Sequence, residues 1–212
     1  MVLKTRIIFV RHGECEGNRV GLFRGRIDFP LNDNGIRQAE LLRDEIKSFK
    51  IDAVYTSPLS RAFRTAQIIA VPHGLTPIVE EGFTNISLGP WEGRAKSEIE
   101  KEQPSEWRIW VTAPEELALP GAERVDDVKE RAFAALKRIL PKHNGETIVI
   151  VTHRAVLKPL FAAMFEVKKP YFWKFHFDTA SYSIVEYNKD RGFTLVLLNE
   201  TKHLSDFVIE EV

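Results

Sequence analysis

Residues 7–18 read IIFVRHGECEGN, a short apolar run that is followed at once by an arginine and a histidine. The apolar run has the length and composition of a buried strand. Arg11 and His12 then stand at the end of that strand, close to a core, where an unpaired charge is costly. The pair therefore predicts that an anion is bound at the end of the strand.

Short β-branched runs alternate with amphipathic segments along the rest of the chain. This alternation predicts an α/β fold, which we expect to be a three-layer α/β/α sandwich with a mostly parallel sheet and a helical lid insertion. Turn or N-cap residues at Asn34-Gly35 and Asp126-Asp127 precede or open two of the expected helices. The expected strands are Arg6–Val10, Ala53–Thr56, Thr147–Val151, Ser181–Tyr187 and Phe193–Leu198. The expected helices are Ile36–Phe49, Leu59–Ala70, Val125–Leu140 and Ala155–Phe165.

The length of 212 residues suits one substantial core, so we expect a single domain over residues 1–212. Residues 87–124 break the alternating pattern, because they combine tryptophans and prolines without a strand signal. We interpret this stretch as a mostly helical lid inserted into the sheet domain.

The overall charge excludes some classes of partner. Thirty basic residues balance thirty acidic residues, which gives no field that favours nucleic acid or a membrane surface. No apolar run approaches the ~18 residues of a membrane span, and the first residues, MVLKTRIIFV, lack the apolar core of a signal peptide. A single cysteine excludes an internal disulfide. We expect a cytoplasmic protein that binds its anion locally.

Two other strand ends carry similar residues. The run TIVIVT is followed by His153-Arg154, and Arg61 falls in the first turn of the helix after the run AVYT. Ligands of open parallel sheets bind outside the carboxyl ends of the strands, and a guanidinium group matches a phosphate with two parallel hydrogen bonds. The sequence thus predicts a phosphate site made from Arg11, His12, Arg61 and His153.

Several other interpretations are weaker. A lone histidine after a strand is more often structural, but two histidines and two arginines at equivalent strand ends reverse that judgement. Cys15 is a poor candidate nucleophile, because the cysteine phosphatases need an arginine six positions later and Gly21 stands there. The segment GLFRGR at 21–26 lacks the spacing of a nucleotide-binding P-loop. The six histidines show no paired metal-ligand spacing, so we expect no metal site.

The chain resembles the histidine phosphatase, or phosphoglycerate-mutase-like, superfamily. The segments that carry the resemblance, in order, are VRHGECEGN, GRIDFPLNDNGIRQAE, YTSPLSRAFRTA, GPWEG and VTHRAV. The resemblance implies that His12 is a nucleophile that is phosphorylated transiently, and that the phosphoryl oxygens are bound by Arg11, Arg61 and His153. It further implies that no metal or cofactor is used. Residues implied to support the phosphate loop are Asn18, Arg24 and Gly25.

This chemistry needs a neutral His12, whereas His153 is more useful as a charged donor. It also needs an acid that protonates the leaving oxygen, and typical members of the superfamily carry a glutamate four residues before the glycine of a G-x-W-E-G segment. Here FTNISLGPWEG at 83–93 places Asn85 at that position. Asparagine donates a hydrogen bond but transfers no proton at neutral pH. Nearby carboxylates, none favoured by spacing, are Glu80, Glu81 and Glu92.

Two departures from the superfamily pattern bear on the substrate. Arg154 follows the second histidine where many relatives have glycine, and the lid segment GAER ends in Arg124. Both additions would suit a substrate that carries a carboxylate beside its phosphate, although a surface ion pair is an equal alternative. The segment FDTASYSIVEY resembles the branch that contains metal-independent phosphoserine phosphatases. We therefore expect a small phosphorylated metabolite as substrate, with phosphoserine first.

Three hypotheses follow. The first is a phosphatase that acts through phospho-His12. The second is a phosphoglycerate mutase. It is less favoured, because mutases of this superfamily usually carry longer lid insertions and also rely on the acid that is missing here. The third is a catalytically impaired paralogue in which Asn85 replaces the acid and which serves as a subunit beside an active phosphatase. A homodimer, or a heterodimer with a related chain, is the expected assembly.

Overall fold

The structure is a computed structural model and describes residues 3–208 and Glu210. Within this part of the chain, six strands form one sheet in the order β3-β2-β4-β1-β5-β6. The first four strands in that order run parallel, whereas β5 is antiparallel to β1 and β6 is antiparallel to β5. The strands are β1 (Thr5–Arg11), β2 (Ala53–Thr56), β3 (Ile78–Val79), β4 (Thr147–Thr152), β5 (Tyr182–Asn188) and β6 (Gly192–Glu200).

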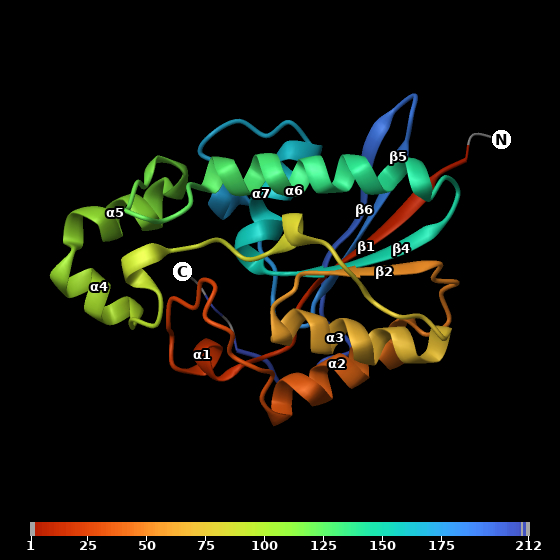
Figure 1. Cartoon of the computed structure of the whole chain (residues 1–212), viewed down its shortest axis with the longest axis horizontal. Helices are drawn as coiled ribbons and strands as arrows, with labels where there is room; N and C mark the ends of the chain where they lie inside the picture. Colours follow the sequence, from red (N-terminus) through yellow and green to blue (C-terminus); the bar gives the residue numbers. More distant parts are fainter. Residues whose placement is uncertain (1–2, 209, 211–212) are drawn as a thin grey trace.

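Helices cover both faces of this sheet (Figure 1). The pair α2 and α3 lies on one face, and the pair α6 and α7 lies on the other, which confirms the predicted three-layer α/β/α class. The α-helices are α1 (Glu16–Arg19), α2 (Asp33–Ile46), α3 (Ser60–Ala70), α4 (Lys96–Glu102), α5 (Pro104–Thr112), α6 (Val125–Ile139) and α7 (Arg154–Met164). Short 3-10 turns are η1 (Val71–His73), η2 (Glu81–Phe83), η3 (Gly89–Trp91), η4 (Pro114–Glu116), η5 (Leu140–Lys142) and η6 (Phe172–Lys174). Among the described residues, no helix combines the length and the apolar character that crossing a bilayer requires.

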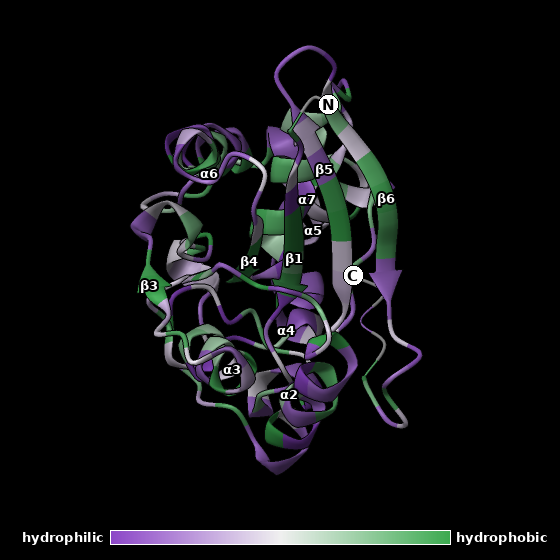
Figure 2. Ribbon diagram, turned by 90° about the vertical axis from the view of Figure 1, so that its right-hand side faces the viewer, coloured by the Kyte–Doolittle hydropathy of each residue, from purple (hydrophilic) through white to green (hydrophobic). Residues whose placement is uncertain are grey.

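Alternation along β1 divides the apolar interior into two cores. Ile7 and Phe9 pack with residues of α6 and α7, whereas Ile8 and Val10 pack with residues of α2 and α3. All four side chains are buried, so β1 has no polar face, as expected for a central strand covered on both sides. Figure 2 shows this hydrophobic character along β1 and β4. The run that opens the sequence is therefore the centre of the molecule.

Most predicted elements agree with the structure to within three residues at each end. The start of α2 is a correction. The helix begins at Asp33, before the expected Asn34-Gly35 turn, because the side chain of Asn32 accepts a hydrogen bond from the main-chain nitrogen of Gly35 (2.8 Å) and caps the first turn. The two-residue strand β3 and the one-turn helix α1 are too short to give a periodic signal and were not predicted.

Residues 87–124, expected to form a lid, contain α4, α5 and two 3-10 turns. The two helices extend from one end of the molecule, beside α1 (Figure 1). Trp91 and Trp110 are buried, and their ring centroids lie 4.9 Å and 5.3 Å from that of Phe23. This aromatic cluster packs the segment against the loop that follows α1.

A glycine contact fixes the loop that follows β1. A Cβ atom added to Gly35 would lie 1.9 Å from the carbonyl oxygen of Glu14, and one added to Gly13 would lie 2.4 Å from the carbonyl oxygen of Gly35. Only glycine allows two main chains to approach so closely. The first turn of α2 therefore packs directly on the main chain next to His12.

We predict that Gly35→Ala destabilises the protein. Replacing glycine by alanine inside a helix normally stabilises it by up to ~1 kcal/mol, but here the methyl group collides with main-chain atoms, and we expect the free energy of unfolding to fall by about 1–3 kcal/mol. Urea unfolding measures the change. Glu40→Ala, an exposed position of the same helix, is the control and should change stability little. A more stable Gly35→Ala protein would contradict the close contact.

Candidate active site

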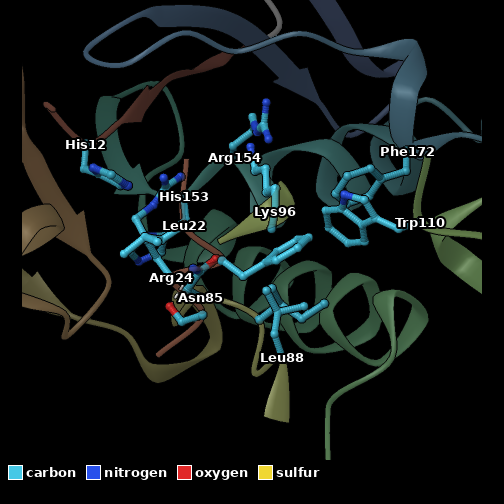
Figure 3. Close-up of a pocket in the computed structure, with 14 residues that line it drawn as sticks. His12, Leu22, Arg24, Asn85, Leu88, Lys96, Trp110, His153, Arg154 and Phe172 are labelled. Atoms are coloured by element: carbon cyan, nitrogen blue, oxygen red, sulfur yellow. Dashed lines mark hydrogen bonds between the residues drawn. The ribbon is translucent and has the colours of Figure 1, made fainter. Parts of the chain in front are cut away.

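The pairing of β1 with β4 places two histidines side by side. Arg11 is the register partner of Thr152, so the next residue of each strand is a histidine, His12 and His153. The main-chain nitrogen of His12 donates to the carbonyl oxygen of Thr152 (3.0 Å), and the two imidazole centroids are 5.1 Å apart. Both side chains are buried and line one pocket (Figure 3). The strand ends thus converge as the sequence predicted.

The main chain selects the tautomer of His12. Its Nδ1 lies 2.7 Å from the carbonyl oxygen of Gly13. Since a carbonyl oxygen only accepts hydrogen bonds, Nδ1 carries the hydrogen and Nε2 keeps a lone pair. Burial, and then the positive charges of Arg61 and Arg11, hold the pKa of His12 well below 6.5. The neutral imidazole can therefore attack an electrophile through Nε2.

The side chain of Ser57 contacts the imidazole of His153. Its Nε2 lies 2.8 Å from the hydroxyl oxygen of Ser57, and its Nδ1 is buried without a hydrogen-bond partner among the described residues. Burial, followed by the charge of Arg61, also lowers the pKa of His153 well below 6.5. The neutral form is thus favoured, whereas an anion bound nearby would offset the positive charges and favour the protonated donor expected from the sequence.

Main-chain carbonyl oxygens anchor Arg11 and Arg61 through part of each guanidinium group. Arg11 donates through Nη1 to the carbonyl oxygen of Phe177 (2.7 Å), and Arg61 donates to the carbonyl oxygens of Ile27 (2.9 Å) and Gly25 (3.0 Å). The Nε atom of each arginine is buried and has no partner within the described part of the chain. Leaving a buried donor unpaired costs about 1–3 kcal/mol. Such donors, carried by cations, favour an anionic ligand.

Gly25 links Arg61 to the position of the expected acid. Its φ angle is +49°, and a Cβ atom there would lie 2.2 Å from Oε1 of Glu92, so the position requires glycine. The carbonyl oxygen of Gly25 accepts from Arg61 and also from Nδ2 of Asn85 (2.8 Å). Asn85 is buried at the pocket wall, and its Oδ1 finds no partner among the described residues.

The three glutamates considered as replacement acids are engaged elsewhere. Oε1 of Glu92 accepts from the main-chain nitrogens of Arg26 (3.1 Å) and Leu88 (2.8 Å). Oε1 of Glu80 accepts from Arg138 (2.8 Å), and Glu81 accepts from the hydroxyl of Thr84. Their side chains are absent from the pocket wall that the described residues form. Position 85 therefore faces the pocket with an amide and without a nearby substitute carboxylic acid from this loop.

A second group of cations extends the pocket away from the histidines. Lys96 and Arg154 lie between the histidine pair and an aromatic wall that includes Trp110 and Phe172 (Figure 3). Burial lowers the pKa of Lys96 to about 8. Arg124, expected to contribute to this group, instead lies at the N-terminus of α6, where it donates to the carbonyl oxygen of Glu115 (3.5 Å) and does not line the pocket.

Three contributing residues were not predicted from the sequence. Lys96 comes from α4, and the carboxylate of Glu210 reaches Arg11 and Arg24 from the segment after β6. Lys158, which is buried, places its amine 3.9 Å from the ring centroid of Trp173. Burial, and then the charge of Arg154, lower the pKa of Lys158 to about 6. Only Lys158 had a usable signal, since it follows Arg154 by four residues on one face of α7.

The remaining predicted residues lie around this pocket. Asn18, in α1, donates from Nδ2 to Glu210 (2.9 Å) and accepts from the main-chain nitrogen of Cys15 (3.0 Å). Arg24 donates to the carbonyl oxygen of Gly17 (2.9 Å) and to Glu210 (3.0 Å). Among the described residues, no group of three or more histidine, cysteine, aspartate or glutamate side chains is placed to hold a metal ion. That the protein uses no metal remains a prediction.

The chain is similar to known proteins over most of its length. The family described as the histidine phosphatase superfamily (branch 1) matches residues 7–201, and the chain belongs to this family. The chain is a phosphatase.

Two named phosphatases and one further solved structure resemble the chain. Phosphoserine phosphatase 1 of Hydrogenobacter thermophilus is 34% identical over 206 residues, which is 97% of both chains. The structure of YhfR from Bacillus stearothermophilus has a TM-score of 0.88 and 32% identity, covering 94% of this chain and 98% of that one. Phosphoserine phosphatase of Entamoeba histolytica, solved with 3-phosphoglyceric acid, has a TM-score of 0.82 and 28% identity, covering 94% and 98%.

The lowered pKa values give a prediction for titration. In a buffer without phosphate or sulfate, the imidazole signals of His12 and His153 should keep their neutral-form NMR shifts as the pH falls through 6.5, because a lowered pKa delays protonation to more acidic pH. Spectra of His12→Gln and His153→Gln assign the two signals. A midpoint at or above 6.5 for both histidines would contradict the predicted effect of burial and the neighbouring arginines.

Proposed function

We propose that the chain is a metal-independent phosphomonoesterase that hydrolyses a small phosphorylated metabolite, with phosphoserine as the leading substrate. The observation that carries the proposal is the lone pair of His12 Nε2 at the pocket wall, where the charges of Arg61 and Arg11 lower the pKa of the imidazole. Each of these arginines also has a buried Nε atom without a partner among the described residues. A nucleophile next to fixed cations suits transfer of a phosphoryl group, whose charge increases on the equatorial oxygens.

Hydrolysis proceeds in two steps in this proposal. Nε2 of His12 attacks phosphorus, the bond between phosphorus and the ester oxygen breaks, and the ester oxygen leaves as an alcohol after taking a proton from water, since Asn85 supplies none. Water then attacks the phosphohistidine and releases inorganic phosphate together with free His12. Division of one difficult reaction into two transfers is the usual benefit of a covalent intermediate. Arg11, Arg61 and His153 would bind the phosphoryl oxygens in both steps, with Asn18, Arg24 and Gly25 supporting them.

The choice of phosphoserine rests on charge beside the phosphate site. Arg154 and Lys96 line the pocket next to the histidine pair, where they would meet a carboxylate of the substrate. The name of the Hydrogenobacter thermophilus relative, which spans nearly the whole chain, supports the same substrate. Arg124 lies outside the pocket wall, so the proposal assigns the carboxylate to Arg154 and Lys96.

Asn85 supports a second candidate function, that of a catalytically impaired subunit beside an active phosphatase. The amide lies at the pocket wall, and the nearby glutamates are bound to other groups. Loss of a general acid costs about 10²–10⁴ in rate. Such a chain would act in a heterodimer with a related phosphatase, whereas the active enzyme is expected as a homodimer, and both are expected in the cytoplasm. A phosphoglycerate mutase fits less well, because mutases of this superfamily usually carry longer lid insertions and also rely on the missing acid.

We predict that His12→Ala abolishes turnover of every phosphomonoester and formation of an acid-labile phosphoenzyme. Nε2 of His12 keeps its lone pair because Nδ1 donates to the carbonyl oxygen of Gly13, whereas Nε2 of His153 contacts the hydroxyl group of Ser57. Radiolabelling with a phosphorylated substrate and acid quenching measures the intermediate. His73→Ala, on the 3-10 turn after α3, is the control and should label normally. Labelling of His12→Ala at the wild-type level would remove this residue from the role.

Position 85 gives a prediction that separates the two candidate functions. Aryl phosphates release a good leaving group that needs no proton, whereas phosphoserine releases a poor alkoxide. We expect the wild-type protein to be far weaker on phosphoserine than on an aryl phosphate. Asn85→Glu should raise phosphoserine turnover by on the order of 10² and change aryl turnover much less.

Asn85→Gln is the matched control, because it has the length of glutamate without the acid. Steady-state rates of all three proteins on both substrates complete the test. If the wild-type chain alone hydrolyses phosphoserine efficiently and Asn85→Glu gives no gain, another residue is the acid and the impaired-subunit hypothesis loses its support.

A further inference from the structure

The chain places a carboxylate of its own among the residues expected to bind phosphate. Glu210 is 6% exposed. Its Oε2 accepts a short hydrogen bond from Nη2 of Arg11 and another from Nδ2 of Asn18 (2.9 Å), and its Oε1 accepts from Nη1 of Arg24 (3.0 Å). Surrounding cations, Arg11 and Arg24 foremost, outweigh burial and hold the pKa of Glu210 well below 4.5. The side chain is therefore an anion at neutral pH.

The second group of cations holds the same residue. Nζ of Lys96 lies 3.9 Å from Oε1 of Glu210, and Nη1 of Arg154 donates to its main-chain carbonyl oxygen (2.7 Å). Glu210 thus contacts residues that are expected to bind the phosphate, namely Arg11, Asn18 and Arg24. It also contacts Lys96 and Arg154, which are proposed to bind a carboxylate of the substrate. A ligand that binds Nη2 of Arg11, Nη1 of Arg24 or Nζ of Lys96 therefore competes with Glu210 for these groups.

The cations give a reason for this arrangement. Arg24, Lys96 and Arg154 line one pocket, and Arg11 shares the carboxylate of Glu210 with Arg24 and Lys96. Like charges gathered in this way repel one another, and Glu210 offsets that repulsion. It carries one negative charge and two acceptor oxygens, whereas a phosphate ester carries up to two charges and three free oxygens. A ligand with a phosphate alone replaces part of the Glu210 contacts, and a ligand with a phosphate and a carboxylate replaces all of them.

We propose that Glu210 is a specificity-determining residue, an internal competitor that occupies the anion pocket and yields to substrates carrying a second acidic group beside the phosphate. The proposal rests on the proposed phosphatase function. Phosphomonoesters without a second acid bind weakly because they compete with Glu210 and supply no second anion for the positions of Lys96 and Arg154. Substrates with both groups displace it at a smaller net cost.

Glu210→Gln tests the proposal, since it removes the charge and keeps the shape, and Glu210→Ala removes the side-chain contacts as well. Asp206→Asn is the matched control, because Asp206 is an acid of the same segment with a side chain 71% exposed. Calorimetry with inorganic phosphate measures anion binding without any turnover. We expect both Glu210 variants to bind phosphate about tenfold more tightly or better, and the control to bind as wild type does.

Steady-state kinetics then test specificity. For p-nitrophenyl phosphate, KM should fall about tenfold in the Glu210 variants, while kcat changes little. For phosphoserine, KM should change much less, so the ratio of kcat/KM for phosphoserine to kcat/KM for p-nitrophenyl phosphate should fall below its wild-type value. Unchanged or weaker phosphate binding in both variants would overturn the competition. Tighter phosphate binding with an unchanged ratio would overturn the specificity role. If every protein lacks turnover on both substrates while phosphate binding tightens as expected, the proposed hydrolysis fails and the competition at Glu210 stands.

Discussion

The in-register pairing of β1 with β4 is the constraint on which the rest of the site depends. Because Arg11 pairs with Thr152, the following residues bring two imidazoles to a centroid separation of 5.1 Å. A slip by one residue would turn every side chain of a strand to the opposite face. The two cores prevent that slip, since Ile7 and Ile8 are buried in different layers. Ordinary apolar packing thus holds the candidate nucleophile in place.

The sequence predicted those features that local periodicity or a simple rule of sheets controls. Strands and long helices have clear periods, and the carboxyl ends of parallel strands share an edge, so the approach of His12, His153 and Arg61 followed from their positions. Lys96 and Glu210 had no such signal. They reach the pocket through the packing of α4 and of the segment after β6, which depends on tertiary contacts that no local pattern encodes.

Electrostatics explains why proton donation is the difficult part of this site. The positive charges that favour a phosphate also stabilise any carboxylate beside them, as the lowered pKa of Glu210 demonstrates. A carboxylic acid in such surroundings stays ionised until another anion offsets the charge. A bound phosphate supplies that anion. Binding and protonation would therefore be linked, because a bound phosphate would raise the pKa of an acid near the leaving oxygen.

The carbonyl oxygen of Gly13 has a consequence for the chemical identity of the proposed intermediate. Because it holds the hydrogen on Nδ1 of His12, a phosphoryl group transferred to this imidazole would be attached to Nε2. The product would be the τ regioisomer of phosphohistidine, in which phosphorus lies on the ring nitrogen remote from Cβ. A main-chain atom would set this regiochemistry, so replacing the side chains around the ring would alter the rate at which the proposed intermediate forms without changing which isomer forms.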